Sequence, residues 1–114
     1  MAIRLILLDV DGTLTTREKK ITPQTREALL KAQDHGAVLG LSSGRTRQGL
    51  YRFSRQLDMD KHNGLFVCYN GGQVVNCQSG QVLFNHPLPS DQIKPLLDHL
   101  KQFEVVPMID HGEY

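Results

Sequence analysis

The sequence has no excess of charge of either sign, because its 114 residues carry 13 lysines and arginines against 12 aspartates and glutamates. Nucleic-acid-binding domains typically have a basic excess or a long basic block, so we expect no DNA or RNA ligand. Long apolar runs are missing too. The N-terminal apolar run is interrupted by Asp9 and is too short for a signal-peptide core or a membrane span. We therefore expect a soluble, cytoplasmic protein that does not bind a membrane.

Metal-binding patterns of cysteine and histidine are also scarce. Cys68 and Cys77 flank an Asn-Gly-Gly turn and do not form a Cys-x-x-Cys pair. The five histidines are scattered, and no two stand four residues apart as zinc ligands on a helix do. We expect two free thiols, buried or half-buried, and the sequence gives no support for a zinc site.

What the chain does contain is an apolar segment that ends in two acids. Residues 3–8 are largely apolar, and Asp-Val-Asp-Gly-Thr follows at residues 9–13. This order predicts a buried strand that carries acids at its end, although a plain turn is the structural alternative. In an extended chain Asp9 and Asp11 face one way, and Val10 faces the protein. Carboxylates about 5 Å apart repel by about 3 kcal/mol at an effective dielectric of 20, which favours a bound cation.

The next segment predicts a strand–helix–strand unit. Thr22 and Pro23 have the features of a helix start, and Gly36 suits the end of a helix that runs to about His35. The apolar residues 37–41 then predict a second strand. This kind of crossover makes the two strands parallel and neighbours, so their carboxyl ends share one edge of the sheet.

Polar residues follow the second predicted strand. Ser-Ser-Gly-Arg at residues 42–45 precedes a helix predicted over residues 46–57. Hydroxyl groups, a glycine and a helix N-terminus together can bind an anion, although either serine could instead cap the helix. Residues 42–45 would lie one or two strand spacings, about 5 to 10 Å, from Asp9. We therefore predict a phosphate site at residues 42–45.

The pattern changes after a third predicted parallel strand at residues 65–69. An Asn-Gly-Gly turn ends that strand, and residues 73–76 and 81–85 then resemble the two strands of a hairpin. We place a domain boundary at this turn, between a first domain of residues 1–70 and a second domain of residues 71–114.

The last part of the chain predicts one helix and one strand. Ser90 could cap a helix whose apolar residues recur at helical spacing. The apolar residues 105–109 predict a further strand.

Together these motifs resemble those of the haloacid dehalogenase (HAD) superfamily of phosphohydrolases. The string Leu-Asp-Val-Asp-Gly-Thr-Leu at residues 8–14 looks like its first motif. Ser-Gly-Arg at residues 43–45 resembles the second motif of the Cof-type branch, where Thr-Gly-Arg is usual. Asn70 and Gly71 resemble the hinge beside the substrate entrance. The resemblance implies an α/β fold with a partial Rossmann-like, HAD-type parallel sheet and the beginning of an α/β cap domain.

The resemblance also implies roles for the two acids. Asp9 would attack phosphorus to form an aspartyl phosphate, and Asp11 would protonate the leaving alcohol and then activate water. A magnesium ion, Mg2+, would be held by the Asp9 carboxylate and the Asp11 backbone carbonyl.

Phosphate-binding residues follow from the same resemblance. The Ser43 hydroxyl and the Gly44 amide would hold a phosphoryl oxygen, with Ser42 as the less favoured substitute. Arg45 could contact phosphate, but a role in solvent or at the helix end is slightly favoured. Small phosphorylated metabolites, above all sugar phosphates, are the implied substrates.

Two motifs of the family have no counterpart in the chain. They supply a lysine and an acidic cluster, whereas the lysines after Tyr69 are Lys94 and Lys101, on the expected cap helix. We expect an N-terminal fragment of a Cof-type enzyme, inactive or feebly active alone, since losing one electrostatic stabiliser costs about 10^2 to 10^3 in rate. An incomplete sheet or cap also favours self-association.

Two other interpretations stay open. A receiver domain of a signalling system has a similar length, but it needs an aspartate at the tip of the third strand, where this chain has Tyr69 and Asn70. A fragment without catalytic activity, which binds phosphate or metal or serves as an interaction module, is the second alternative.

Overall fold

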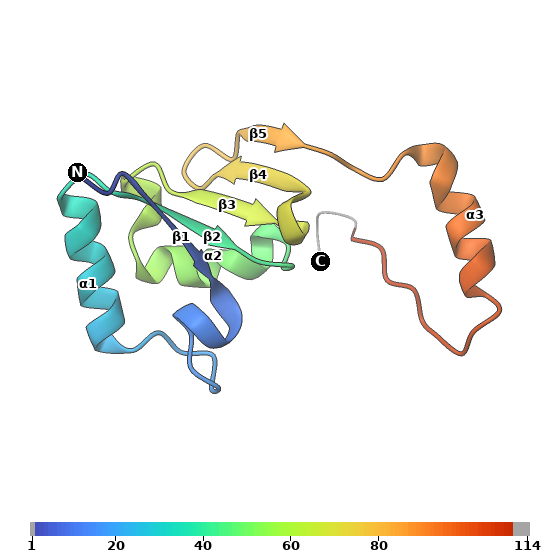
Figure 1. Ribbon diagram of the computed structural model, residues 1–114, viewed down its shortest axis with the longest axis horizontal. Helices are drawn as coiled ribbons and strands as arrows, with labels where there is room; N and C mark the ends of the chain where they lie inside the picture. The colour runs from blue at the N-terminus through green and yellow to red at the C-terminus, as the bar shows by residue number, and fades with distance from the viewer. Residues whose placement is uncertain (1, 111–114) are drawn as a thin grey trace.

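The structure, a computed structural model, describes residues 2–110, and its five strands form one sheet in the order β1-β2-β3-β4-β5 (Figure 1). The strands are β1 (Leu5–Asp9), β2 (Val38–Ser42), β3 (Leu65–Cys68), β4 (Gln73–Asn76) and β5 (Val82–Asn85). The helices are α1 (Pro23–Asp34), α2 (Arg47–Gln56) and α3 (Ser90–Leu100), with short helical turns at Met59–Lys61 and Tyr69–Gly71. The predicted α/β class is confirmed.

The first three strands are parallel, as predicted. β1 pairs with β2, and β2 pairs with β3. Helix α1 begins where the sequence indicates, because the Thr22 hydroxyl oxygen accepts a hydrogen bond from the Thr25 N–H and Pro23 occupies the first turn. The carboxyl ends of all three strands therefore lie along one edge of the sheet.

The predicted hairpin forms, and it extends the same sheet. β4 runs antiparallel to β3, and β5 runs antiparallel to β4. The sheet is therefore mixed, with three parallel strands followed by two antiparallel ones, and the chain leaves it only after β5 (Figure 1). The division into domains at residue 71 stays a prediction.

The hydrophobic core lies on one face of the sheet. Alternate residues of the central strands, such as Leu39, Leu41 and Phe66, are fully buried against Leu50 and Phe53 of α2. Fully burying one side chain of this size contributes about 1.5 to 3 kcal/mol. This packing holds α2 against the strands whose ends carry the polar motifs.

The expectation that β1 is a buried strand is wrong. β1 lies at one edge of the sheet, and within the described residues only β2 pairs with it. Ile6 and Leu8 pack against the core, whereas Leu5 and Leu7, which point to the other face, are 49% and 56% exposed. A buried strand and an edge strand cannot be distinguished from an apolar run alone, because the burial of a strand depends on which elements cover it.

The predicted strand at residues 105–109 is also wrong. This segment has no regular structure. Part of it lies along α3, where Val105, Pro107 and Ile109 share an apolar pocket with Leu97 and Leu100. Strand structure requires a neighbouring strand, and α3, along which part of this segment lies, stands apart from the sheet (Figure 1). None of the helices within residues 2–110 is long and apolar enough to span a bilayer.

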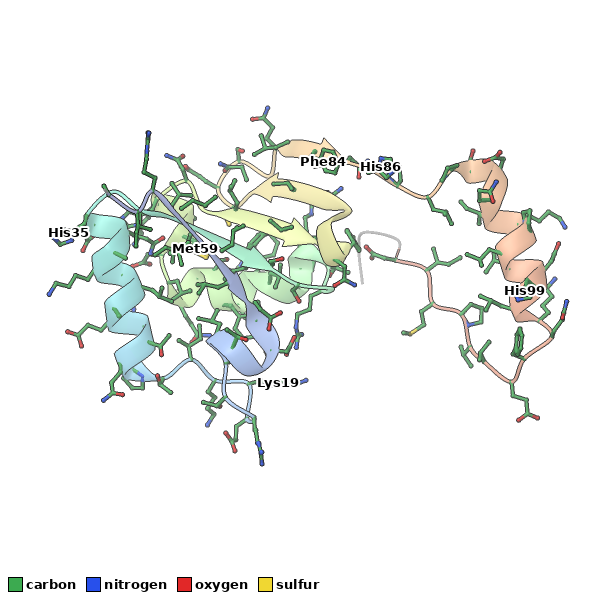
Figure 2. The ribbon with its side chains drawn as sticks, viewed as in Figure 1. Lys19, His35, Met59, Phe84, His86 and His99 are labelled. Atoms are coloured by element: carbon green, nitrogen blue, oxygen red, sulfur yellow. The ribbon has the colours of Figure 1, made fainter. Side chains whose placement is uncertain are left out.

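Both cysteines are free and buried, as predicted. Burial raises the pKa of the Cys68 thiol to about 11 and that of the Cys77 thiol to about 12. Neither cysteine is therefore a thiolate near neutral pH. Figure 2 shows His35, His86 and His99 on separate parts of the fold, so these three do not form a common site.

We expect the isolated chain to self-associate through the open face and edge of β1, because exposed apolar strands pair readily. Sedimentation velocity will show dimers or larger species, and Leu7→Lys will shift them towards monomer because it places a charge on that face. Leu96→Lys, a matched change at a half-exposed leucine of α3, will have the smaller effect. A wild-type chain that stays monomeric at high concentration would contradict this expectation.

Candidate active site

The two polar motifs meet at the carboxyl ends of β1 and β2. Asp9 is the last residue of β1, and it pairs in register with Ser42, the last residue of β2. Neighbouring strands lie about 4.8 Å apart, so Asp9 and the loop that follows Ser42 occupy the same end of the sheet. The predicted juxtaposition of acids with a serine and glycine loop is present in the structure.

A tight turn at Val10–Leu14 fixes the two acids after β1. The Val10 side chain is fully buried, and its carbonyl accepts hydrogen bonds from the N–H and the hydroxyl of Thr15, both at 3.0 Å. Gly12 has a φ of +82°, a conformation that glycine adopts without steric cost. With Val10 anchored inside, Asp9 and Asp11 are left exposed.

One oxygen of the Asp9 carboxylate is held in place. Thr13 donates its hydroxyl proton to Oδ2 of Asp9 over 3.1 Å. Within residues 2–110 the second oxygen, Oδ1, has no hydrogen-bond partner, so it can meet a ligand. Thr13 is not among the site residues predicted from the sequence.

Asp11 forms a two-pronged ion pair with Arg45. Nε and Nη2 of the guanidinium donate to Oδ2 and Oδ1 of the carboxylate at 2.9 and 2.8 Å. These hydrogen bonds lower the pKa of Asp11. The positive charge of Lys19, which is labelled in Figure 2, lowers this pKa further. Asp11 is thus an ionised carboxylate turned towards Arg45, a contact not predicted from the sequence.

The loop after β2 is organised by Ser43. Its backbone N–H donates to the Val67 carbonyl at 3.0 Å, and its hydroxyl oxygen accepts from the Arg45 N–H at 3.2 Å. Helix α2 is capped by Thr46, whose hydroxyl accepts from the Gly49 N–H. Neither Ser42 nor Ser43 is therefore the N-cap of α2, and the hydroxyl proton of Ser43 stays available as a donor.

The turn after β3 is tied to this loop. The N–H of Asn70 donates to the Ser43 carbonyl at 3.0 Å, and the N–H of Tyr69 donates to the Arg45 carbonyl at 3.2 Å. Three consecutive residues, Tyr69, Asn70 and Gly71, have positive φ angles. The predicted hinge residues thus lie directly beside the predicted phosphate loop.

The oxygen atoms at this edge fit a magnesium ion. Within residues 2–110, no group of three or more His, Cys, Asp or Glu side chains is arranged to hold a metal ion. Mg2+ is usually bound by one or two carboxylates together with waters and substrate phosphate. The exposed Asp9 carboxylate and the backbone carbonyl of Asp11 are suitable ligands of this kind.

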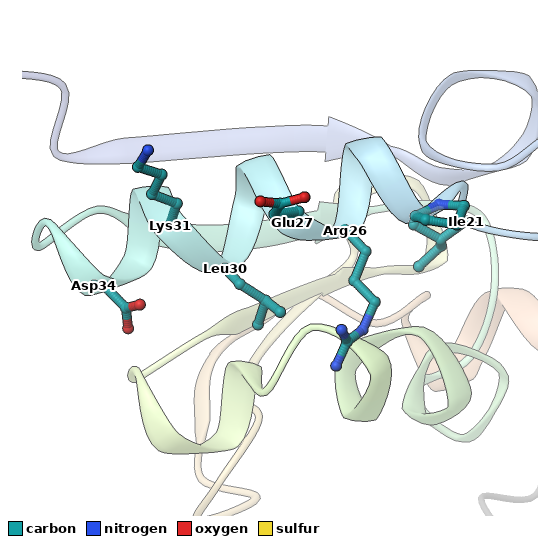
Figure 3. Close-up of a pocket in the computed structure, with 7 residues that line it drawn as sticks. Ile21, Arg26, Glu27, Leu30, Lys31 and Asp34 are labelled. Carbon is teal, nitrogen blue, oxygen red and sulfur yellow. The ribbon is translucent and has the colours of Figure 1, made fainter.

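A hollow of about 780 Å³ lies elsewhere, along α1 (Figure 3). It is lined by residues of mixed charge such as Arg26, Glu27, Lys31 and Asp34, and by none of the predicted site residues. The candidate active site at the carboxyl ends of β1 and β2 is therefore separate from this hollow.

A family profile described as haloacid dehalogenase-like hydrolase matches residues 6–113. The chain belongs to this family. The fold agrees with this membership, since a crystal structure of a haloacid dehalogenase-like hydrolase from Bacteroides thetaiotaomicron superimposes with a TM-score of 0.81 and 34% identity. That superposition covers 88% of this chain and 38% of the Bacteroides chain.

Two curated relatives of this haloacid dehalogenase-like chain are phosphatases by name. Pyridoxal phosphate phosphatase YbhA of Escherichia coli is 30% identical over 105 residues, which cover 92% of this chain and 38% of the relative. The 5-amino-6-(5-phospho-D-ribitylamino)uracil phosphatase YcsE of Bacillus subtilis is 32% identical over 72 residues, 63% of this chain and 28% of the relative. The chain spans about a third of the length of the first curated relatives it matches.

We expect Arg45→Gln to raise the pKa of Asp11 towards its ordinary value, because the hydrogen bonds that stabilise the ionised carboxylate are lost. Carboxyl 13C NMR titration of the chain measures this directly. Asp98 of α3, whose pKa is lowered by hydrogen bonds from Lys94 and Lys101, is an internal control whose pKa will not change. An Asp11 titration that is the same in both proteins would show that Arg45 does not hold this carboxylate.

Proposed function

We propose that a protein containing this chain is a magnesium-dependent phosphatase that forms an aspartyl phosphate on Asp9. The observation that supports this most is the parallel register of Asp9 with Ser42, which puts a carboxylate beside the Ser43 and Gly44 loop. Membership of the hydrolase family and two relatives named phosphatases point the same way.

The first step is a substitution at phosphorus. Thr13 holds Oδ2 of Asp9, so Oδ1 is the oxygen that forms the new bond while the bond from phosphorus to the substrate alcohol breaks. The Ser43 hydroxyl and the Gly44 N–H would donate to a phosphoryl oxygen and stabilise its charge.

Asp11 would move the protons. Paired with Arg45, its carboxylate is ionised, which suits it to take a proton from the water that later attacks the aspartyl phosphate. To protonate the leaving alcohol in the first step, Asp11 must carry a proton and release Arg45. The ion pair is therefore the resting arrangement of the acid, and not its proton-donating one.

Magnesium would be held by the Asp9 carboxylate and the Asp11 carbonyl, and it would offset the repulsion between Asp9 and the phosphate dianion. The isolated chain would be feebly active, because residues 2–110 offer no third acid for such an ion and the chain spans about a third of its relatives.

Small phosphorylated metabolites, sugar phosphates among them, are the proposed substrate class. The two relatives are named for chemically different phosphate esters, a pyridoxal phosphate and a ribitylaminouracil phosphate. What these compounds share is the phosphoryl group, and that is the part which Asp9, Ser43 and Gly44 would contact. A cytoplasmic location stays a prediction from the sequence.

The test combines a phosphoryl mimic with turnover. In the presence of Mg2+, beryllofluoride will give a bound 19F NMR signal in the wild-type chain and in Asp34→Asn, an exposed-acid control on α1, but not in Asp9→Asn. The wild-type chain will release p-nitrophenol slowly from p-nitrophenyl phosphate. Asp9→Asn will abolish this release, because the attacking oxygen is lost.

Other results would contradict the proposal in distinct ways. An adduct that persists in Asp9→Asn would exclude Asp9 as the nucleophile. Saturable phosphate binding without any adduct or turnover would favour the alternative of a binding module. A receiver-type function would need a carboxylate after β3, where Tyr69 and Asn70 stand.

A further inference from the structure

We propose that the side-chain amide of Asn70 is a third ligand of the phosphoryl group, beside the Ser43 hydroxyl and the Gly44 amide. The inference rests on the proposed function, because it assigns one more residue to the same phosphate site. It gives Asn70 a direct contact with substrate instead of the hinge role that the sequence implies.

The first observation is the close approach of the Asn70 side chain to Gly44. A Cβ atom built on Gly44 would lie 3.1 Å from Oδ1, 3.2 Å from Nδ2 and 3.4 Å from Cγ of Asn70. All three atoms of the amide group therefore lie near Gly44, and a Cβ atom at position 44 would require the amide to shift by a few tenths of an ångström. The amide nitrogen of Asn70 is next to the residue whose N–H is the expected phosphate donor.

The second observation is the backbone that holds Asn70 there. Both Tyr69 and Asn70 are left-handed, with φ angles of 52° and 55°, and such conformations are costly for residues other than glycine. Two hydrogen bonds to the Ser43 and Arg45 carbonyls hold the turn in this shape. Asparagine tolerates left-handed backbone better than most residues, so it can occupy this position with its amide directed at Gly44.

The third observation concerns which donors are available. Arg45, the cation of the loop, is already engaged by both oxygens of Asp11. The Asn70 side chain is exposed, and within residues 2–110 its amide has no hydrogen-bond partner. An NH2 group at this point can donate to an anionic oxygen without displacing an existing contact.

The experiment measures the dissociation constant of inorganic phosphate, in the presence of Mg2+, from the 1H–15N NMR signals of the whole chain. Asn70→Gly removes the amide and keeps a residue suited to positive φ. The matched control is Asn63→Gly, because Asn63 has the same φ of 55° at the other end of β3. We expect Asn70→Gly to raise the dissociation constant about tenfold or more, as for the loss of one hydrogen bond to a charged group. Asn63→Gly will bind phosphate like the wild type.

A second measurement separates direct contact from structural support of the loop. In the wild-type chain the side-chain NH2 signals of Asn70 will shift with the same dissociation constant as the Gly44 amide signal, while those of Asn63 will not move. If the Asn70 side-chain signals stay fixed, or if Asn70→Gly binds phosphate as tightly as the wild type, the proposal is overturned.

Ser43→Ala separates the failure of this inference from the failure of the proposed function. If Ser43→Ala weakens phosphate binding and Asn70→Gly does not, only the role of Asn70 is lost. If the wild-type chain binds no phosphate, or binds it equally well in Ser43→Ala, the phosphate site itself is wrong and the inference falls with it.

Discussion

The parallel pairing of β1 with β2 is the constraint on which the site depends. β1 is apolar on both faces, so hydrophobicity alone would penalise a one-residue slip only weakly. Gly40 pairs with Leu7 and leaves room for its side chain, because a Cβ atom at position 40 would require the end of the Leu7 side chain to move. Buried Val10 fixes the next turn. With this register Asp9 faces Ser42; a slip by one residue would turn Asp9 to the opposite face of the sheet.

The two acids have different hydrogen-bond partners. Asp9 is held by a neutral hydroxyl and keeps one oxygen open, whereas Asp11 is held by a guanidinium that favours its ionised form. Charge-assisted, two-pronged contacts are stronger than neutral hydrogen bonds, so Asp11 is the more constrained of the pair. Two acids from one short motif thus acquire separate chemical characters from the loops that surround them.

Much of the fold follows from local sequence, and the contacts within the site do not. Thr22, Pro23 and the apolar periodicity locate α1 and the strands because capping and alternation act over a few residues. The ion pair between Asp11 and Arg45 joins residues 34 apart, and no spacing rule predicts it. The exposure of β1 and the irregular residues 105–109 also escaped prediction, since both depend on which elements lie alongside.

We propose that the ends of β1 and β2 form one site for a cation and a phosphoryl group. Paramagnetic Mn2+, used in place of Mg2+, tests it most directly because it broadens the NMR signals of nearby nuclei. We expect the amide signals of residues 9–12 and 43–45 to disappear together at the lowest Mn2+ concentrations, while those of α3 persist. Early broadening around the acids of α3, or of residues 9–12 without residues 43–45, would contradict it.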